Sequence, residues 1–237
     1  MKGISEKTLI KIKDLKASVK LNNGDMLTTV TNANMELQRG RSYAIVGKSG
    51  SGKTSLISII GLLNREYEGE YLYDGISISA LKDRDLSILR ANNIGFVFQN
   101  YSLIKHLRVW ENIELPLLYA KKSFTAKQRH EIITGLLKSV GLESKENDYP
   151  INLSGGEQQR VAIARALAVS PEAILCDEPT GALDKKTGKQ IMDLLHQVVL
   201  KNGIMLLIVT HDLDIAKTCN TIFEMDGGRL QCVKYDS

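Results

Sequence analysis

The sequence predicts an α/β fold in which a core of strands and helices carries an antiparallel β-subdomain and an inserted α-helical subdomain. Apolar runs of strand length recur in both halves of the chain, apolar and polar residues alternate near its start, and helical spacing dominates its middle. With 237 residues and 43% hydrophobic content, the chain has the size and composition of one globular domain. We therefore expect a single domain over residues 1–237, with the core and β-subdomain in 1–100 and 169–237 and the helical subdomain in 101–168.

Charge and composition narrow the class of partners. A net charge of +4, spread along the chain, does not favour nucleic acid, which usually requires a concentrated basic patch. The three cysteines, Cys176, Cys219 and Cys232, form no CxxC pair, which argues against a disulfide framework and suits a reducing compartment. The longest apolar run, Ile204 to Val209, has strand length, and no run reaches the ~20 residues of a membrane span. The first residues lack the apolar stretch of a signal peptide, so we expect any membrane role to come through a partner.

The first hundred residues carry strand and turn signals. Apolar and polar residues alternate from Ile10 to Glu36 around the turn signal Asn22-Asn23-Gly24, which is typical of two antiparallel strands. The short apolar run from Ser42 to Gly47 is typical of a buried parallel strand. The remaining elements predicted here are a helix over Thr54–Leu63, a strand over Glu70–Tyr73 with a turn at Asp74-Gly75, and a strand over Ile94–Gln99.

The middle of the chain is predicted to be helical, and strands return after Pro171. Helical spacing covers Trp110–Ala120 and Ala126–Val140, and Gly141 is placed to end the second helix in a left-handed conformation. Pro116 is expected to interrupt the first helix or to start its second half. The later strands are predicted over Ala173–Cys176, Ile204–Thr210 and Thr221–Met225.

Residues Gly47 to Thr54 match the pattern GxxxxGK[ST], directly after a predicted strand and before a predicted helix. The glycines let successive backbone N–H groups point at phosphate oxygens, and the helix adds the positive end of its dipole. Lys53 is expected to reach the β- and γ-phosphates, and the Thr54 hydroxyl to bind Mg²⁺. The predicted nucleotide-binding residues are Gly47, Lys48, Ser49, Gly50, Ser51, Gly52, Lys53, Thr54 and Ser55. This motif predicts nucleotide binding, but many nucleotide-binding families share it.

Two acidic residues follow the apolar run Ala173–Cys176. A buried strand would place Asp177 at the carboxyl end of a sheet beside the phosphate-binding loop, where its charge can hold Mg²⁺. Glu178, one residue later, points elsewhere and can orient and deprotonate an attacking water. Alone, the pair could equally be a solvated strand end, so its interpretation as a hydrolytic centre depends on the phosphate-binding loop.

A third motif, LSGGEQQR over Leu153–Arg160, decides the family. Together with the two motifs above it closely resembles the signature of the ABC ATPases, and the resemblance covers nearly the whole chain. Gln99 at the end of an apolar strand, Asp184 in the segment PTGALD and His211 after a predicted strand match three further motifs in family order. The resemblance implies a P-loop NTPase core of the RecA-like type that binds ATP and Mg²⁺ and hydrolyses ATP.

The resemblance also implies roles for these residues. Ser154 and the glycines after it precede a predicted helix over Glu157–Ala168, so they form a second anion-binding helix start. In the family this segment binds the γ-phosphate of the ATP held by the other protomer, so that two subunits pair head to tail around two ATPs. The additional nucleotide-binding residues are Ser154, Gly155, Gly156, Glu157 and Asp184. The implied catalytic residues are Glu178, His211, Gln99 and Lys53, and the implied metal ligands are Thr54, Gln99 and Asp177.

One position departs from the family pattern. Members usually carry an aromatic residue in the N-terminal β-region that stacks on adenine, and the matching position falls near Lys20, where no aromatic residue stands. Val19, the stem of Lys20 or another residue must then contact the base. We therefore expect weaker affinity or selectivity for purines.

Spacing and detail separate the branches of the family. Only 54 residues lie between Gln99 and Ser154, enough for a helical subdomain but far too few for the arms of chromosome-maintenance ATPases. The segment WENIELPLL over 110–118 and the pair Thr180-Gly181 look like the lipoprotein-release, macrolide-efflux and antimicrobial-peptide-resistance ATPases. That branch implies a transmembrane permease partner, a homodimer or equivalent ATPase pair, and a peripheral position on the cytoplasmic face of the cell membrane.

Two functions stay open within that branch. In the first, closure of the dimer on ATP drives export or extraction of a substrate. In the second, as in the cell-division ATPase of the same branch, the chain transmits force to an extracytoplasmic partner without transport. A soluble ATPase, such as an iron–sulfur assembly subunit, is a third alternative. The sequence does not name a transported molecule, because selectivity lies in the permease.

Overall fold

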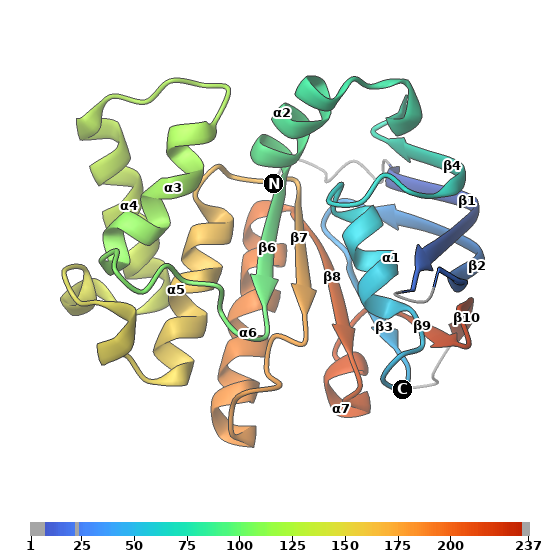
Figure 1. Ribbon diagram of the computed structural model, residues 1–237. Coiled ribbons are helices and arrows are strands. Elements are labelled where there is room, and N and C mark those ends of the chain that lie inside the picture. The colour runs from blue at the N-terminus through green and yellow to red at the C-terminus, as the bar shows by residue number, and fades with distance from the viewer. Residues whose placement is uncertain (1–7, 22–23, 234–237) are drawn as a thin grey trace.

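The computed structural model describes residues 8–21 and 24–233, which form one ten-stranded sheet with helices around it (Figure 1). The strands are β1 (Thr8–Lys20), β2 (Met26–Gln38), β3 (Ser42–Val46), β4 (Glu68–Tyr73), β5 (Ile76–Ser77), β6 (Ile94–Phe98), β7 (Ala173–Asp177), β8 (Met205–Thr210), β9 (Thr221–Asp226) and β10 (Arg229–Val233). The helices are α1 (Lys53–Ile60), α2 (Asp83–Asn93), α3 (Val109–Tyr119), α4 (Ala126–Val140), α5 (Gly155–Leu167), α6 (Lys185–Asn202) and α7 (Leu213–Ala216). The strand order is β5-β4-β1-β2-β10-β9-β3-β8-β7-β6.

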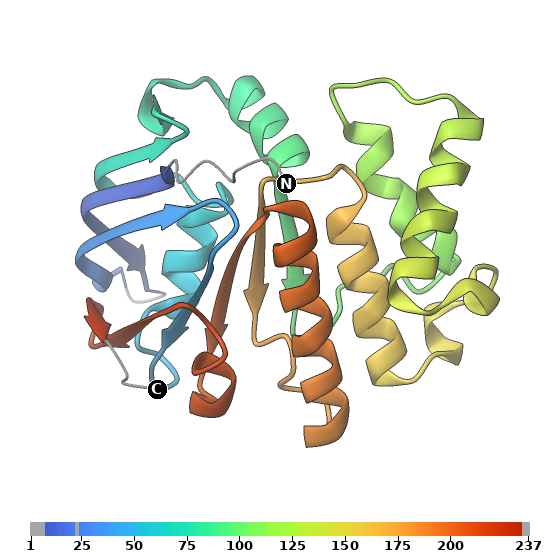
Figure 2. The same ribbon diagram turned by 180° about the vertical axis from the view of Figure 1, so that it is seen from behind.

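The parallel part of the sheet is covered on both faces. Strands β9, β3, β8, β7 and β6 run parallel to one another. In β8, Leu207 and Val209 belong to the apolar cluster that contains the side chains of α1, whereas Leu206 and Ile208 belong to the cluster of α6. Figure 2 shows α6 on the face of the sheet opposite α1. The continuous apolar runs in the sequence follow from this double cover.

The N-terminal strands form the antiparallel part of the sheet. β1 pairs with β2 on one side and with β4 on the other. Ile10, Leu15 and Leu37 are completely buried on the inner side of these strands, while polar residues between them are exposed. This is the alternation from which the sequence predicts two antiparallel strands. The expected turn residues Asn22 and Asn23 lie outside the described residues.

Helices α3, α4 and α5 lie side by side at the β6 edge of the sheet (Figure 1) and share a cluster of buried side chains that includes Ile113, Leu137 and Val161. Helix α4 ends at Gly141 in the left-handed conformation, with φ 69°, as the sequence predicts. Pro116, however, does not interrupt α3, which is one continuous helix. The proline lies close to the end of the helix, where its missing N–H removes a single helical hydrogen bond.

Glu172, immediately before β7, joins the β-subdomain to the core at the amino ends of the parallel strands. Its carboxylate accepts hydrogen bonds from Arg39 Nη2 at 2.9 Å, from the Tyr73 hydroxyl at 3.1 Å and from Asn93 Nδ2 at 3.1 Å. Burial, together with the neighbouring Glu172 carboxylate, raises the pKa of Tyr73. Because the groups are partly buried and one carboxylate serves three donors, the network fixes the two parts of the sheet more firmly than an exposed ion pair would.

Helix α5 approaches β6 very closely at Gly95. A Cβ atom at this position would lie 2.4 Å from the carbonyl oxygen of Ala166. A backbone carbonyl in a helix cannot swing aside, so any side chain at Gly95 would push α5 away from the sheet. Since α5 begins next to Ser154 and β6 leads to Gln99, this contact sets the position of one predicted site segment relative to the other.

The substitution Gly95→Ala is expected to lower the free energy of unfolding by about 1–3 kcal/mol, because it overpacks the contact between α5 and β6. Denaturation in urea measures the change. Gly135→Ala is the matched control, since Gly135 lies in α4 with nothing within 4 Å of an added Cβ. That control is expected to raise stability by about 0.5–1 kcal/mol. Equal stability of Gly95→Ala and the wild type would contradict the close contact.

Candidate active site

The glycine-rich loop between β3 and α1 adopts a backbone conformation suited to glycine. Gly50 and Gly52 have φ values of 77° and 104°. A Cβ on Gly52 would lie 1.9 Å from the carbonyl oxygen of Thr29, so the loop is pressed directly against β2. A loop of this kind presents backbone N–H groups to an anion, and α1 adds the positive end of its dipole.

Lys53 is buried at this loop, with 8% of its surface exposed. Its ammonium group donates hydrogen bonds to the carbonyl oxygens of Gly47 at 2.6 Å and Lys48 at 2.8 Å. The loop therefore holds a positive charge with its own carbonyl groups. Phosphate oxygens, as stronger acceptors, can take over those donors.

One pocket of about 790 Å³ brings this loop together with the ends of three neighbouring strands. Gln99 follows β6, Asp177 ends β7, Glu178 follows it, and His211 follows β8. The volume is that of a small-molecule site. The pocket is lined by Leu27, Thr29, Lys48, Ser49, Gly50, Gly52, Lys53, Thr54, Ser55, Gln99, Asp177, Glu178 and His211.

Two residues of the predicted loop, Gly47 and Ser51, are not among those that line the pocket. The carbonyl of Gly47 holds Lys53, as described above. The Ser51 hydroxyl is buried and has no hydrogen-bond partner among the described residues. An unpartnered buried hydroxyl within the loop is a group that a bound water could satisfy.

Glu178 is held in a fixed orientation. Its backbone is left-handed, with φ 48°, which is uncommon for a residue with a side chain and is found more often at functional sites. Its Oε1 lies 2.8 Å from Nδ1 of His211, and the Thr210 hydroxyl donates to its Oε2 at 3.2 Å. A carboxylate fixed in front of a phosphate-binding loop can orient and deprotonate a water molecule.

The oxygen donors of the pocket fit Mg²⁺. Asp177 supplies a carboxylate, Thr54 a hydroxyl and Gln99 an amide oxygen, and all three line the same pocket. The described residues contain no group of three or more His, Cys, Asp or Glu side chains that could hold a metal. Mg²⁺ does not need such a group, because it commonly takes one or two carboxylates and fills its remaining positions with phosphate oxygens and water.

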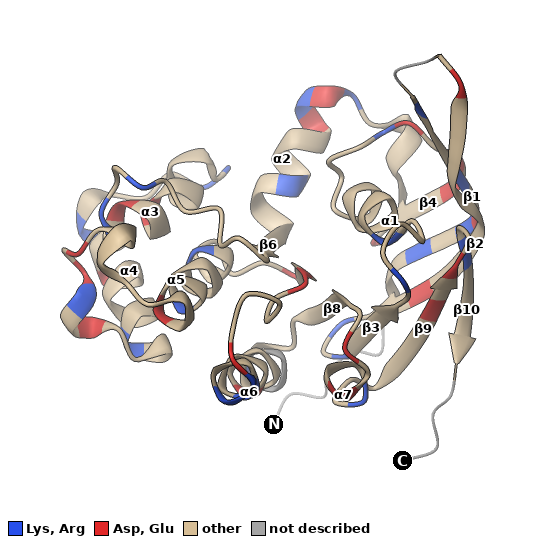
Figure 3. Cartoon of the chain, turned by 60° about the horizontal axis from the view of Figure 1, so that its bottom comes forward, with Lys and Arg blue, Asp and Glu red and all other residues tan. Residues whose placement is uncertain are grey.

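The first turn of α5 is capped by hydrogen bonds between Ser154 and Glu157. The Ser154 hydroxyl accepts a hydrogen bond from the Glu157 N–H at 3.3 Å, and the N–H and hydroxyl of Ser154 both donate to Glu157 Oε2 at 2.8 Å. These bonds from Ser154 lower the pKa of Glu157. Residues 154–157 do not line the pocket around the loop. Figure 3 shows α5 and α1 on opposite sides of β6.

Asp184 also lies outside that pocket and caps α6. Its carboxylate accepts hydrogen bonds from the N–H groups of Lys186 and Thr187 at 3.0 Å each and from the Thr187 hydroxyl at 2.6 Å. Hydrogen bonding by Thr187 lowers the pKa of Asp184. A single chain therefore does not bring Asp184 or residues 154–157 to the phosphate-binding loop.

Sequence patterns alone do not identify two residues of the pocket, Leu27 and Thr29 of β2. The base contact is expected near Lys20, on Val19, the stem of Lys20 or another residue. Neither Val19 nor Lys20 is among the described residues that line the pocket, and Lys20 is exposed. Leu27 pairs with Val19 across the β1–β2 ladder. Pairing the two predicted antiparallel strands residue by residue would place Leu27 opposite Val19, and this is the sequence signal that could identify Leu27 as a pocket residue.

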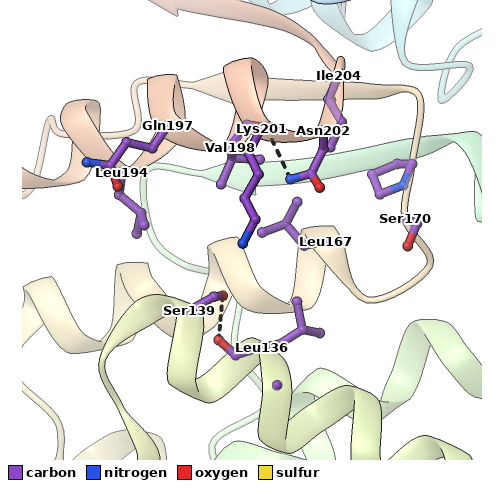
Figure 4. Close-up of a pocket in the computed structure, with 12 residues that line it drawn as sticks. Leu136, Ser139, Leu167, Ser170, Leu194, Gln197, Val198, Lys201, Asn202 and Ile204 are labelled. Atoms are coloured by element: carbon purple, nitrogen blue, oxygen red, sulfur yellow. Dashed lines mark hydrogen bonds between the residues drawn. The ribbon is translucent and has the colours of Figure 1, made fainter. Parts of the chain in front are cut away.

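A second cavity, of about 420 Å³, lies between α4, α5 and α6 (Figure 4). Its walls include the apolar side chains of Leu136, Leu167, Leu194 and Val198. Lys201 is the one charged side chain among the described residues that line it. Without a glycine-rich loop or a carboxylate, this cavity does not offer the groups that phosphate chemistry needs.

Comparison with known proteins assigns the family. The family profile described as ABC transporter matches residues 30–181. The chain is 40% identical to the uncharacterised ABC transporter ATP-binding protein MJ0796 of Methanocaldococcus jannaschii. The 225 aligned residues are 94% of this chain and 95% of that protein. It is 40% identical to the methionine import ATP-binding protein MetN of Haemophilus influenzae, over 94% of this chain and 64% of that protein. It is 43% identical to the macrolide export ATP-binding/permease protein MacB of Mannheimia succiniciproducens, over 84% of this chain and 30% of that protein.

Solved structures agree with this assignment. The dimeric post-hydrolysis structure of the ATP-binding cassette MJ0796 with ADP and Pi matches with a TM-score of 0.86 at 37% identity, over 96% of this chain and 100% of that one. The structure of cbiO1 from Clostridium perfringens, part of the ABC transporter complex cbiONQ, matches with a TM-score of 0.84 at 28% identity, over 95% of this chain and 88% of that one. The predicted P-loop core is thus confirmed, and the chain belongs to the ABC transporter family as one of its ATP-binding, ATP-hydrolysing cassettes.

Proposed function

We propose that two copies of this chain, or the chain and an equivalent ATPase, close head to tail around two ATP molecules and thereby drive export or extraction of a substrate through a membrane permease. One observation carries the proposal: among the described residues, the pocket at the loop has no group from the start of α5. The helix start at Ser154 is suited to bind a phosphate that its own chain does not bring to it. A second protomer supplies the missing half of each site.

Within one protomer, the loop from Gly47 to Thr54 cradles the phosphates. Lys53 exchanges its bonds to the loop carbonyls for bonds to the β- and γ-phosphates. Glu178 orients and deprotonates the attacking water, and His211, at 2.8 Å from its carboxylate, keeps it in place. Catalysis in this arrangement comes mainly from positioning and charge stabilisation.

Mg²⁺, when bound, neutralises charge on the phosphates. The oxygens of Thr54, Asp177 and Gln99 are the donors that would hold it. Gln99 also stands at the junction between β6 and the helical segment that follows, so it is placed to transmit a change at the metal to that segment.

The second protomer contributes the start of α5. The Ser154 hydroxyl and the N–H groups of Gly155 and Gly156 bind the γ-phosphate, and Glu157 and Asp184 lie at the same interface. The dimeric structure of the related MJ0796 cassette with ADP and Pi supports pairing of this kind. Closure then depends on the nucleotide, and loss of the γ-phosphate bond on hydrolysis lets the dimer open.

The permease is proposed to dock beside α3. A cavity of about 440 Å³ between α2, α3, α5 and β6 is lined mainly by apolar residues, including Leu63 and Tyr119, which are 52% and 76% exposed. Arg90, Ser102 and Arg165 also line it. Exposed apolar groups gathered at a groove mark an interaction surface. No helix in the described ranges is long and apolar enough to cross a bilayer. A permease segment in this groove would hold the chain on the cytoplasmic face of the membrane. The similar proteins include a macrolide exporter and a methionine importer, so export is proposed from the likeness of the 110–118 segment and of Thr180-Gly181 to the export branch.

Glu178→Gln is expected to slow ATP hydrolysis by at least about 100-fold, because general bases contribute ~10²–10⁴-fold. ATP binding should remain, so size-exclusion chromatography with ATP and Mg²⁺ should show a trapped dimer and chromatography with ADP a monomer. Glu224→Gln, at an exposed carboxylate of β9, controls for the loss of one charge and should hydrolyse ATP at the wild-type rate. Hydrolysis by Glu178→Gln at a near wild-type rate would reject Glu178 as the base.

Asp177→Asn is expected to raise the melting temperature of the nucleotide-free chain at pH 7 while abolishing Mg²⁺-dependent hydrolysis. Burial and the neighbouring Glu178 raise the pKa of Asp177, and Lys53 opposes them. A carboxyl with a raised folded-state pKa lowers stability above its unfolded pKa, and that cost disappears as the pH falls through the folded-state pKa. The gain from the asparagine should therefore be largest near neutral pH and shrink toward pH ~4. A lower melting temperature for Asp177→Asn at pH 7 would contradict this interpretation.

Tyr119→Glu is expected to abolish co-purification of the chain with its permease, because it places a charge on the proposed docking groove. The ATPase rate of the isolated chain should stay unchanged. Ile76→Glu is the control, since Ile76 is 50% exposed on β5, in the β-subdomain. If both variants co-purify with the permease as the wild type does, the groove is not the docking site.

A further inference from the structure

We propose that the base of the bound nucleotide lies on an aliphatic surface formed by Leu27 and Val19, and that the site consequently accepts nucleoside triphosphates with little regard to the base. The proposal rests on the proposed function, since it requires the phosphates to occupy the loop between β3 and α1. It makes Leu27 the residue that sets base preference.

Contact between β2 and the loop places Leu27 at the nucleotide pocket. The carbonyl of Thr29 touches the loop at Gly52, where a Cβ would lie only 1.9 Å away. Leu27 lies two residues earlier on the same strand, and both residues line the pocket. Since Leu27 and Thr29 line the same pocket, the strand that contacts the loop continues as a surface beside it. Leu27 is 50% exposed, so that surface is open.

Val19, on the neighbouring strand, extends this surface beyond the residues that line the pocket. It pairs directly with Leu27 in the β1–β2 ladder and is partly buried. Residues that are directly opposite on paired strands have their side chains on the same face. The neighbouring pair belongs to the other face, where the Ser18 hydroxyl donates to the Thr28 hydroxyl at 3.3 Å. Met26, adjacent to Leu27, is 64% exposed and alternates to that other face.

The chemistry of this surface gives little discrimination between bases. None of the described residues that line the pocket is Phe, Tyr or Trp, and the His211 ring lies against Glu178 at 2.8 Å. Aliphatic side chains contact any base through non-directional burial and carry no donor or acceptor to read its edge. Thr29, the other residue of this strand that lines the pocket, donates its hydroxyl to the carbonyl of Ala17 at 3.3 Å. Affinity therefore comes from the phosphates, which all nucleotides share.

Equilibrium binding of ADP, GDP, CDP and UDP to the full chain with Mg²⁺ tests the proposal without hydrolysis or dimer closure. The four dissociation constants of the wild type should agree within about threefold, a difference of less than ~0.7 kcal/mol. Leu27→Ser should weaken all four nucleotides by a similar factor. Leu27→Tyr should strengthen purines over pyrimidines by about fivefold or more, because it supplies an aromatic stacking surface. Met26→Ser, on the other face of the strand, is the matched control and should leave all four unchanged.

Two results would overturn the proposal. One is a wild type that binds ADP more than about tenfold more tightly than CDP. The other is a Leu27→Ser variant with unchanged affinities and a wild-type melting curve. Should Leu27→Tyr fail to fold, Val19→Ser provides a second test and should weaken all four nucleotides together. If the wild type binds none of the four diphosphates, the proposed function itself is rejected. Failure of the base-preference proposal can therefore be distinguished from failure of the proposed function.

Discussion

The chemistry of this chain depends on the parallel register of four strands. Phe98 of β6 pairs with Asp177 of β7, Asp177 pairs with Val209 of β8, and Val46 of β3 pairs with Thr210 of β8. The strands consequently end at nearly the same level, and the residue or loop that follows each one enters the same pocket. A slip of one residue in any pair would turn its side chains to the opposite face of the sheet and remove a group from the site. The buried apolar faces and the Glu172 network prevent such a slip.

The site groups are paired with other groups of the same chain. Lys53 is bonded to loop carbonyls, Glu178 to His211, and Ser154 to Glu157. Binding therefore exchanges one set of hydrogen bonds for another, and each exchange contributes far less free energy than the bond itself. In return, the groups are held close to their working positions, which reduces the reorganisation needed at the moment of reaction. The bonds between Ser154 and Glu157 must rearrange if the Ser154 hydroxyl is to donate to a phosphate.

Local constraint explains which parts of this structure could be predicted from the sequence. Strands β7 and β8 are predicted to within one residue at each end, because double burial leaves continuous apolar runs bounded by polar residues. Helix α2 is not predicted, since Leu86 is its one buried residue and little apolar periodicity results. Strand β10 is not predicted from the sequence either, because none of its residues is buried.

The pocket residues divide in the same way, into those that a local sequence motif predicts and those that long-range contacts bring to the site. The phosphate-binding loop and Asp177 follow from motifs with a strict backbone requirement. Leu27 does not, because its place in the pocket comes from contact between β2 and a loop distant in sequence. The roles of Ser154 and Asp184 cannot be derived from one chain at all, since both lie away from the phosphate-binding loop and the proposed contact is made between protomers.

The sharing of each ATP site between two chains is tested most directly by dilution. ATP hydrolysis per chain would be measured from micromolar to low nanomolar protein, with sedimentation at the same concentrations to report the oligomeric state. We expect the rate per chain to fall as dilution separates the dimer, because each monomer lacks half of a site. A constant rate per chain at concentrations where the protein sediments as a monomer throughout turnover would contradict the shared site.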